Sequence, residues 1–480
     1  MLFNSLQYLI FLPIVLLLYW LLPKKMRAVI LLISSYIFYA AWNPVYLVLL
    51  IAMTVFNYMF GFVLKWADKT KKWWLAFGIL VNVGVLGYYK YADFMVQNLF
   101  GIMNIMHIPH NDLVVKIFLP LGISFFTFEF LHYIVDVYKG DEPEKNFVHF
   151  ALLPGFFPSQ IAGPIKRYQD FMPQLKEPRV FDGDNFEKGF VMVLHGLAKK
   201  VLLADNLALF VNMVYAAPSE FTNLELWLAT YAFAFQVYCD FSGYTDVAIG
   251  SALMMNLKIP PNFNVPYMSN NIRELWHRQH ISLSFWFRDY VYIPLGGSRC
   301  SVPMIYRNLI LTTALAGLWH GAAWHFVAWG AFQGLSLIVH REWMRFYKRV
   351  DWLYEFVKGK IWNAIAIFIT FQAFTVSFVF FRADDLPSSF QIIGRMFEFW
   401  NLYPDKPLKF FTSSGSLILP LIPIVLAALV AAHILSEHLR NINFWPRRPR
   451  WMQALYCTVI ILFMVSLMPE ETNKFIYFQF

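Results

Sequence analysis

Long apolar runs, separated by short clusters of charge, recur along almost the whole chain. A helix that crosses a membrane needs about 20 predominantly apolar residues. By this measure the pattern predicts roughly eleven or twelve crossings, with soft boundaries. The runs on either side of His320 are short, so we expect a re-entrant or broken helix there. The predicted spans are 6–22, 28–41, 45–64, 74–89, 115–137, 190–214, 226–253, 309–320, 324–339, 361–381, 417–435 and 454–468.

The composition supports this interpretation. Of 480 residues, 59% are hydrophobic and only 14% are charged, which is too apolar for a soluble protein of this length. We therefore predict an all-α, polytopic integral membrane protein whose residues 1–480 form a single domain. Cys239, Cys300 and Cys457 are too few for a disulfide framework and are expected to be free thiols.

Basic residues predict the orientation in the membrane. Residues 1–7 carry no positive charge and no small-residue cleavage site follows before Lys24, so a removed signal peptide is not expected. The positive-inside rule places both chain termini outside the cell and the basic loops in the cytoplasm. The net charge of +9 is then a topology signal that calls for a lipid bilayer and for no nucleic acid. The basic residues assigned to the cytoplasm are Lys24, Lys25, Arg27, Lys65, Lys69, Lys71, Lys72, Lys166, Arg167, Lys199, Lys200 and the clusters in 341–349 and 447–450.

Residues 262–299 are unusually polar and aromatic for this chain. On a regular helix His277 and His280 would share one face, which could hold a metal or an anionic group. Two histidines without a third ligand are a weak metal signal, and we predict no metal. The alternative is an interfacial amphipathic helix with Trp276 and Trp286 at headgroup level. Arg273, Glu274 and Arg288 lie nearby in the sequence.

A second polar signal is His320, which sits in an apolar segment between Gly317 and Gly321. An ionisable group inside the membrane is a functional hypothesis by default, and an imidazole can accept and return a proton near neutral pH. The flanking glycines would let a substrate approach the backbone closely. The alternative is a histidine that hydrogen-bonds a neighbouring helix. On a regular helix His325 points about 140° away from His320, so the two are not expected to act as a pair.

Five segments together resemble the membrane-bound O-acyltransferase family, in particular its alginate O-acetylation branch. They occur in the family's order and extend over most of the chain, which makes the resemblance far more specific than one motif. The segments are Pro120–Glu129, Ile161–Pro164, Tyr238–Asp246, Trp276–Gly297 and Gly317–Gly321.

The resemblance implies helices around a central tunnel, with His320 as the catalytic histidine. It implies a cytoplasmic acyl thioester, acetyl-CoA or another, as donor substrate, and no bound cofactor. Relatives often carry a second histidine where this chain has Gln333, which cannot exchange protons. The positive or hydrogen-bonding groups for the donor's phosphates would be Arg273, His277, Arg278, His280 and Arg288. Residues expected around the chamber are Asp240, Asp246, Trp319 and Gln333, and for the two aspartates a structural role is an equal alternative.

The activity implied is transfer of an acyl group, expected to be acetyl, across the bacterial plasma membrane. The acceptor would be an exported or cell-wall polysaccharide of the alginate, peptidoglycan or cellulose type. An extracytoplasmic SGNH-type or related O-acetyltransferase is the implied partner. The enzymatic alternative is a D-alanyl transferase of the teichoic-acid type. Alternatives from other classes are a structural scaffold or a transporter, although a transporter would show broken helices in two related halves.

The last six residues, 475–480, are too aromatic for an ordinary exposed tail. They resemble the Phe-x-Tyr-x-x-Phe ending of a small partner subunit in the teichoic-acid D-alanylation system. That resemblance implies that Tyr477 is an acyl carrier, because a phenolic hydroxyl can hold an acyl ester. The alternative is an aromatic anchor at the membrane surface.

Overall fold

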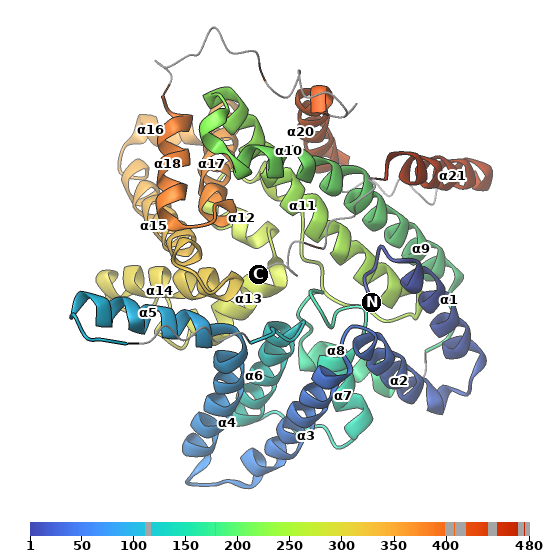
Figure 1. Cartoon of the computed structure of the whole chain (residues 1–480). Helices are drawn as coiled ribbons and strands as arrows, with labels where there is room; N and C mark the ends of the chain where they lie inside the picture. The colour runs from blue at the N-terminus through green and yellow to red at the C-terminus, as the bar shows by residue number, and fades with distance from the viewer. Residues whose placement is uncertain are drawn as a thin grey trace. The chain divides into compact units, whose positions relative to one another are not determined.

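The computed structural model describes residues 1–110, 117–177, 179–398, 408, 419–439, 449–468 and 475. These residues form helices joined by turns, and no β-strand occurs among them, which confirms the predicted all-α class (Figure 1). The chain divides into two compact units. The first comprises Met1–His195 and Tyr244–Pro260, and the second comprises Gly196–Gly243 and Pro261–Phe480. The assignment of the whole chain to one domain stays a prediction.

The first unit contains the N-terminal helices and nearly all of α9. Its helices are α1 (Leu6–Leu21), α2 (Arg27–Ala40), α3 (Pro44–Trp66), α4 (Lys71–Leu86), α5 (Ala92–Ile105), α6 (Ile123–Lys139), α7 (Phe147–Gly155), α8 (Tyr168–Lys176) and α9 (Gly183–Ala198). The long helix α11 begins in the second unit and ends in the first. A π-helical turn over Gly87–Tyr91 joins α4 to α5, so the predicted span 74–89 is part of a continuous 35-residue helix.

The second unit contains the helices that carry most of the candidate site. They are α10 (Asp205–Ala216), α11 (Asn223–Met254), α12 (Ile272–Arg278), α13 (Ile281–Phe287), α14 (Val302–His320), α15 (Trp324–Tyr347), α16 (Asp351–Val357), α17 (Lys360–Arg382), α18 (Leu386–Met396), α20 (Ile422–Leu439) and α21 (Arg450–Leu467). The short runs around His320 belong to two helices longer than predicted, and the break between them falls at 321–323.

Several helices are suited to cross a membrane. Among the described residues, four are long and apolar enough: Pro44–Trp66, Lys71–Ile105, Lys360–Arg382 and Arg450–Leu467. Shorter apolar helices cover Leu6–Leu21 and Ile422–His438. The total of eleven or twelve crossings stays a prediction.

The predicted span 115–137 is wrong at its start. Helix α6 begins only at Ile123, after Pro120 and a left-handed Gly122 with φ of 74°. A side chain at Gly122 would also crowd the Gln160 carbonyl. The apolar character of the segment concealed this turn, because apolarity alone does not distinguish a helix from a buried loop. Val115 lies outside the described residues.

Asparagine side chains start three of the helices. Asn43 accepts a hydrogen bond from the Val45 amide at 2.9 Å, with proline at the first helical position of α3. Asn146 accepts from two amides at the start of α7, and Asn271 accepts from the Glu274 amide at 2.8 Å in α12. Each cap satisfies backbone donors that the helix itself leaves without a partner.

Buried charges in both units are held in ion pairs. In the first unit, the Lys166 ammonium lies 2.8 Å from the Glu129 carboxylate and side chains of both residues are buried. In the second, the Lys200 ammonium lies 2.6 Å from Asp240 and 2.9 Å from Asp205. Lys166 and Lys200 are therefore buried and paired within the protein, and their placement on the cytoplasmic side stays a prediction. A buried lysine with a carboxylate partner is weaker evidence for orientation than an exposed loop lysine.

Glycines bring α14 and α15 into close contact. A Cβ atom at Gly317 would overlap the Phe326 carbonyl oxygen, and one at Gly330 would overlap the Thr313 carbonyl oxygen. Both obstacles are backbone atoms, so a side chain could be accommodated only if the helices moved apart. The close approach of these two helices fixes the end of α14 and hence the position of His320.

We predict that Gly330→Ala lowers the free energy of unfolding by about 1–3 kcal/mol, because the added methyl group forces the two helices apart. Thermal unfolding of the purified protein in detergent measures the effect. The matched control is Gly84→Ala in α4, where a Cβ atom meets nothing within 4 Å. The control should be neutral or stabilising by about 0.5–1 kcal/mol. Equal destabilisation by both substitutions would contradict the packing argument.

Candidate active site

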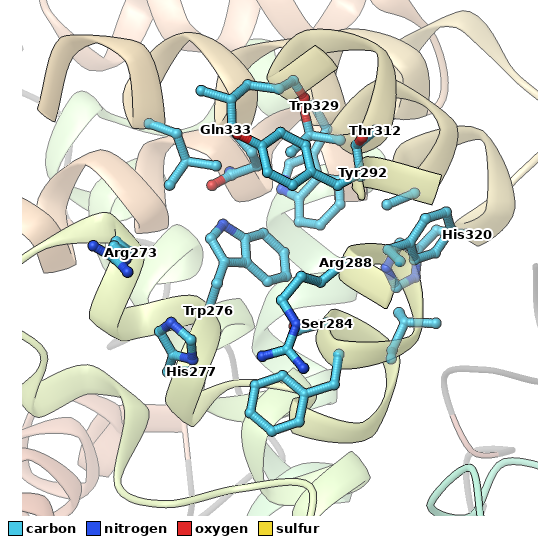
Figure 2. A pocket seen from close by; sticks show the side chains of 17 residues that line it. Arg273, Trp276, His277, Ser284, Arg288, Tyr292, Thr312, His320, Trp329 and Gln333 are labelled. Carbon is cyan, nitrogen blue, oxygen red and sulfur yellow. Dashed lines mark hydrogen bonds between the residues drawn. The ribbon is translucent and has the colours of Figure 1, made fainter. Parts of the chain in front are cut away.

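A pocket of about 180 Å³ lies in the second unit, among α12, α13, α14 and α15 (Figure 2). His320 lines it together with three basic side chains, and most of the remaining lining is apolar. The lining residues are Arg273, Trp276, His277, Leu283, Ser284, Phe285, Phe287, Arg288, Tyr292, Leu309, Thr312, Thr313, Ala316, His320, Trp329, Gln333 and Leu337.

His320 is the last residue of α14 and is only 6% exposed. Its ring lies among aromatic rings, with centroid distances of 4.8 Å to Trp319, 5.2 Å to Trp329 and 5.1 Å to Phe381. An imidazole in such surroundings is shielded from water while one side of it faces the pocket. This placement suits a group that acts on a bound substrate.

The glycines beside His320 do not have the predicted role. The space that a side chain at Gly321 would need is filled by the Phe326 ring. Gly317 faces the backbone of α15, as described above. These glycines make room for neighbouring protein atoms, so the expectation that they admit a substrate is wrong.

The basic part of the pocket comes from α12 and from Arg288, which directly follows α13. Figure 2 shows Arg273 and His277 together on one side, His320 on the opposite side and Arg288 between them. The Arg288 guanidinium pairs with Asp289 at 2.6 Å and lies 4.5 Å from the centroid of the Phe285 ring. Burial, followed by the nearby Arg273 and Arg288 charges, lowers the pKa of His277. The positive charge at this part of the pocket therefore comes from the two arginines, while His277 is shifted toward its neutral form.

His277 and His280 do not share a helical face. Helix α12 ends at Arg278, and His280 adopts a left-handed conformation with φ of 46° that redirects the chain into α13. His277 lines the pocket, whereas His280 is buried against Phe241 with 4.5 Å between ring centroids. Its ring lies 6.4 Å from the ring of His320. The prediction of one regular helix is wrong because it assumed uniform 100° steps through this break.

Two other predicted residues form ion pairs away from the pocket lining. The Arg278 guanidinium contacts Glu274 at 2.7 Å and Glu437 of α20 at 2.8 Å. Asp240 is held by Lys200, which favours the structural alternative for this aspartate. Asp246 is half-buried on α11 in the first unit, so it belongs to a different unit from His320.

The remaining predicted residues have distinct positions. Trp319 is buried beside His320, and Gln333 lines the pocket while its Nε2 donates to Ser377 Oγ at 2.8 Å. His325 Nδ1 lies 2.7 Å from the Phe380 carbonyl oxygen, so this histidine links α15 to α17. Tyr477 lies outside the described residues. Phe475 is described, and its buried ring lies 4.6 Å from the Lys200 ammonium.

Sequence reasoning missed several lining residues. The missed residues on α14 are Thr312 and Ala316, which lie eight and four residues before His320, and those on α15 are Trp329 and Leu337, which lie four residues on either side of the predicted Gln333. A helical face projected from His320 would have found the first two. Those on α15 required knowledge of how the two helices face each other.

Comparison with known proteins decides the family. Residues 146–381 match the membrane-bound O-acyltransferase family. The chain is 42% identical over 409 residues to a probable alginate O-acetylase AlgI of Azotobacter vinelandii, covering 84% of this chain and 79% of the relative. The chain belongs to the membrane-bound O-acyltransferase family. The resemblance drawn from its motifs is confirmed.

Two further relatives indicate the range of the family. A peptidoglycan O-acetyltransferase of Helicobacter pylori is 36% identical over 395 residues, covering 76% of this chain and 73% of the relative. A teichoic acid D-alanyltransferase of Bacillus subtilis is more distant, at 30% over 291 residues and 57% of this chain against 70% of the relative. This membrane-bound O-acyltransferase is therefore a multi-pass membrane enzyme that uses an acyl donor.

Proposed function

We propose that this enzyme transfers an acetyl group from a cytoplasmic thioester, acetyl-CoA, for O-acetylation of an exported or cell-wall polysaccharide. The observation that carries the proposal is that His320 and the basic side chains of Arg273, His277 and Arg288 line one pocket. A thioester such as acetyl-CoA joins an anionic portion to a reactive carbonyl, and the pocket offers a matching group for each. Among the three relatives above, the two with the higher identity are named as a probable alginate O-acetylase and a peptidoglycan O-acetyltransferase. These names support a polysaccharide acceptor and acetyl as the acyl group.

In the proposed chemistry, His320 accepts the proton of an attacking hydroxyl group while that oxygen bonds to the thioester carbonyl carbon. The carbon–sulfur bond then breaks, and the imidazolium returns its proton to the departing thiolate. Arg273 and Arg288 would hold the donor phosphates through charge-assisted hydrogen bonds. Holding both reactants in one small pocket makes the reaction effectively intramolecular.

His280 and Arg278 have different proposed roles from those predicted. The His280 ring is buried close to His320, so it is suited to orient that imidazole and not to bind phosphates. Arg278 is occupied by two carboxylates and is suited to hold α20 against α12. Donor binding is therefore assigned to Arg273, His277 and Arg288.

The first attacking hydroxyl is proposed to be that of Tyr477, which would carry the acetyl group as a phenyl ester to an SGNH-type or related extracytoplasmic partner. The proposed setting is a bacterial inner membrane with both termini outside. The basic residues Lys24, Lys25 and Arg27, which follow the first predicted span, support that orientation. This support does not depend on the buried Lys166 and Lys200.

We predict that His320→Gln lowers acetyl transfer by about 10²–10⁴-fold. The substitution removes the general base, whereas the side chain keeps a similar volume and can still form hydrogen bonds. The measurement is O-acetyl content of the polymer made by cells expressing equal amounts of each variant. His325→Gln is the matched control, because His325 is also a buried histidine but lies outside the pocket lining, and its ring contacts the Phe380 carbonyl oxygen. Normal acetylation in His320→Gln would remove His320 from the mechanism.

We predict that Arg288→Gln raises the apparent KM for acetyl-CoA by about tenfold and leaves acceptor dependence unchanged, because one hydrogen bond to a charged group is lost. Donor titration in isolated membranes gives the value. Arg299→Gln is the control, because Arg299 is exposed and outside the pocket lining. An unchanged donor KM would favour the interfacial-helix alternative for this segment.

We predict that Tyr477→Phe abolishes polymer acetylation while thioester binding persists, because only the proposed carrier hydroxyl is removed. Incubation with labelled acetyl-CoA, followed by proteolysis and mass spectrometry, should reveal an acetyl ester on the C-terminal peptide. Tyr88→Phe, at an exposed tyrosine of the first unit, serves as control. Full acetylation by Tyr477→Phe would show that the tail is an anchor and that another hydroxyl attacks first.

A further inference from the structure

The first unit contains a second pocket, of about 220 Å³, that the acyl-transfer chemistry does not use. Four separate parts of the chain form it: the turn between α1 and α2 with the adjoining helix ends, the start of α7, the end of α8 with the residues that follow, and Leu257 after α11. A basic turn that only marked the cytoplasmic side of the membrane would not require such an enclosure.

The pocket is strongly positive. Of the described residues that line it, five are lysines or arginines and one, Glu177, is a carboxylate, which leaves four formal positive charges. Lys176 is also paired with the buried Glu144 at 2.7 Å. The other basic residues still outnumber the carboxylates, so the site favours an anion. The five basic residues are Lys24, Lys25, Arg27, Lys176 and Arg179.

Arg27 is positioned by its neighbours. One terminal nitrogen donates to the Arg179 carbonyl oxygen at 2.6 Å, and the guanidinium carbon lies 4.8 Å from the centroid of the Trp20 ring. Its buried Nε has no hydrogen-bond partner among the described residues, and the same holds for the buried Nδ1 of His149. Buried nitrogens without partners are uncommon and call for an explanation. Both residues line the pocket, where a phosphate group would offer hydrogen-bond acceptors to the guanidinium and the imidazole.

The surface next to this pocket is apolar. Leu17 and Leu21 on the last turns of α1 are 59% and 72% exposed. Val180 and Phe181, which follow Arg179, are also exposed, and the Phe181 ring packs on Trp20 at 5.2 Å. Because α1 ends here in a basic turn, the pocket belongs at headgroup depth, with lipid-facing surface leading away from it. A soluble phosphate compound would make no use of that surface.

We propose that this pocket binds the phosphate headgroup of an anionic phospholipid, with the acyl chains along the exposed face of α1. The lipid is a structural ligand of the first unit and takes no part in acetyl transfer, so this inference stands apart from the proposed function.

Native mass spectrometry of the full-length protein, released from nanodiscs of equal parts phosphatidylglycerol and phosphatidylcholine, tests the proposal. The wild-type protein should retain phosphatidylglycerol preferentially, and Lys24→Gln/Lys25→Gln should reduce the retained amount about tenfold. Lys69→Gln/Lys72→Gln is the matched control, because it removes two exposed lysines of the same unit outside the pocket. The control should retain the lipid.

Three results would overturn the proposal. They are no preference for phosphatidylglycerol in the wild-type protein, an equal loss in both double variants, and displacement of the lipid by millimolar inorganic phosphate or coenzyme A. The last would identify the pocket as a site for a soluble phosphate compound. Because the readout is lipid retention, a failure here leaves acetyl transfer by His320 untouched, and an inactive enzyme can still retain the lipid.

Discussion

The close approach of α14 and α15 positions the proposed chemistry. Gly317 and Gly330 face backbone carbonyls of the opposite helix, so the two helices meet at a separation that no other residue at these positions would allow. Helix α14 ends where this contact ends, and its last residue is His320. Trp329 and Gln333 reach the same pocket from α15. The packing of this helix pair therefore sets the distance between the histidine and the pocket wall formed by α15.

A second constraint is that charge inside an apolar protein must be paired. Water cannot satisfy a buried ammonium or carboxylate, and leaving one without a partner costs several kcal/mol (roughly 3–5). Lys166 with Glu129, and Lys200 with Asp205 and Asp240, meet that requirement within their own units. The basic residues that line the two pockets are more exposed, and they are the ones available to a ligand. Burial thus distinguishes structural charges from candidate binding charges, because Arg288 and Lys176 are also paired but remain exposed.

The segment around His280 shows where sequence reasoning fails locally. Its residues were correctly singled out as unusual, but equal angular steps placed both histidines on one face. The left-handed residue His280 ends that regularity, and it directs one histidine into the pocket and the other against Phe241 and Trp319. Positive φ is usually found at glycine and is rare for a residue with a Cβ atom. The local sequence around His280 therefore does not predict the turn.

The sequence by itself determined the helical class, the membrane environment, the family and the histidine of interest. These depend on properties that are local in the chain: the length of apolar runs, and motifs of a few adjacent residues. Only the tertiary structure decided that Lys200 is buried with Asp240, that Arg278 is held by Glu437, and that Arg288 shares a pocket with His320. Each of these pairs joins residues that are distant in sequence. Such contacts follow from how helices pack, and a single sequence does not encode them in any local pattern.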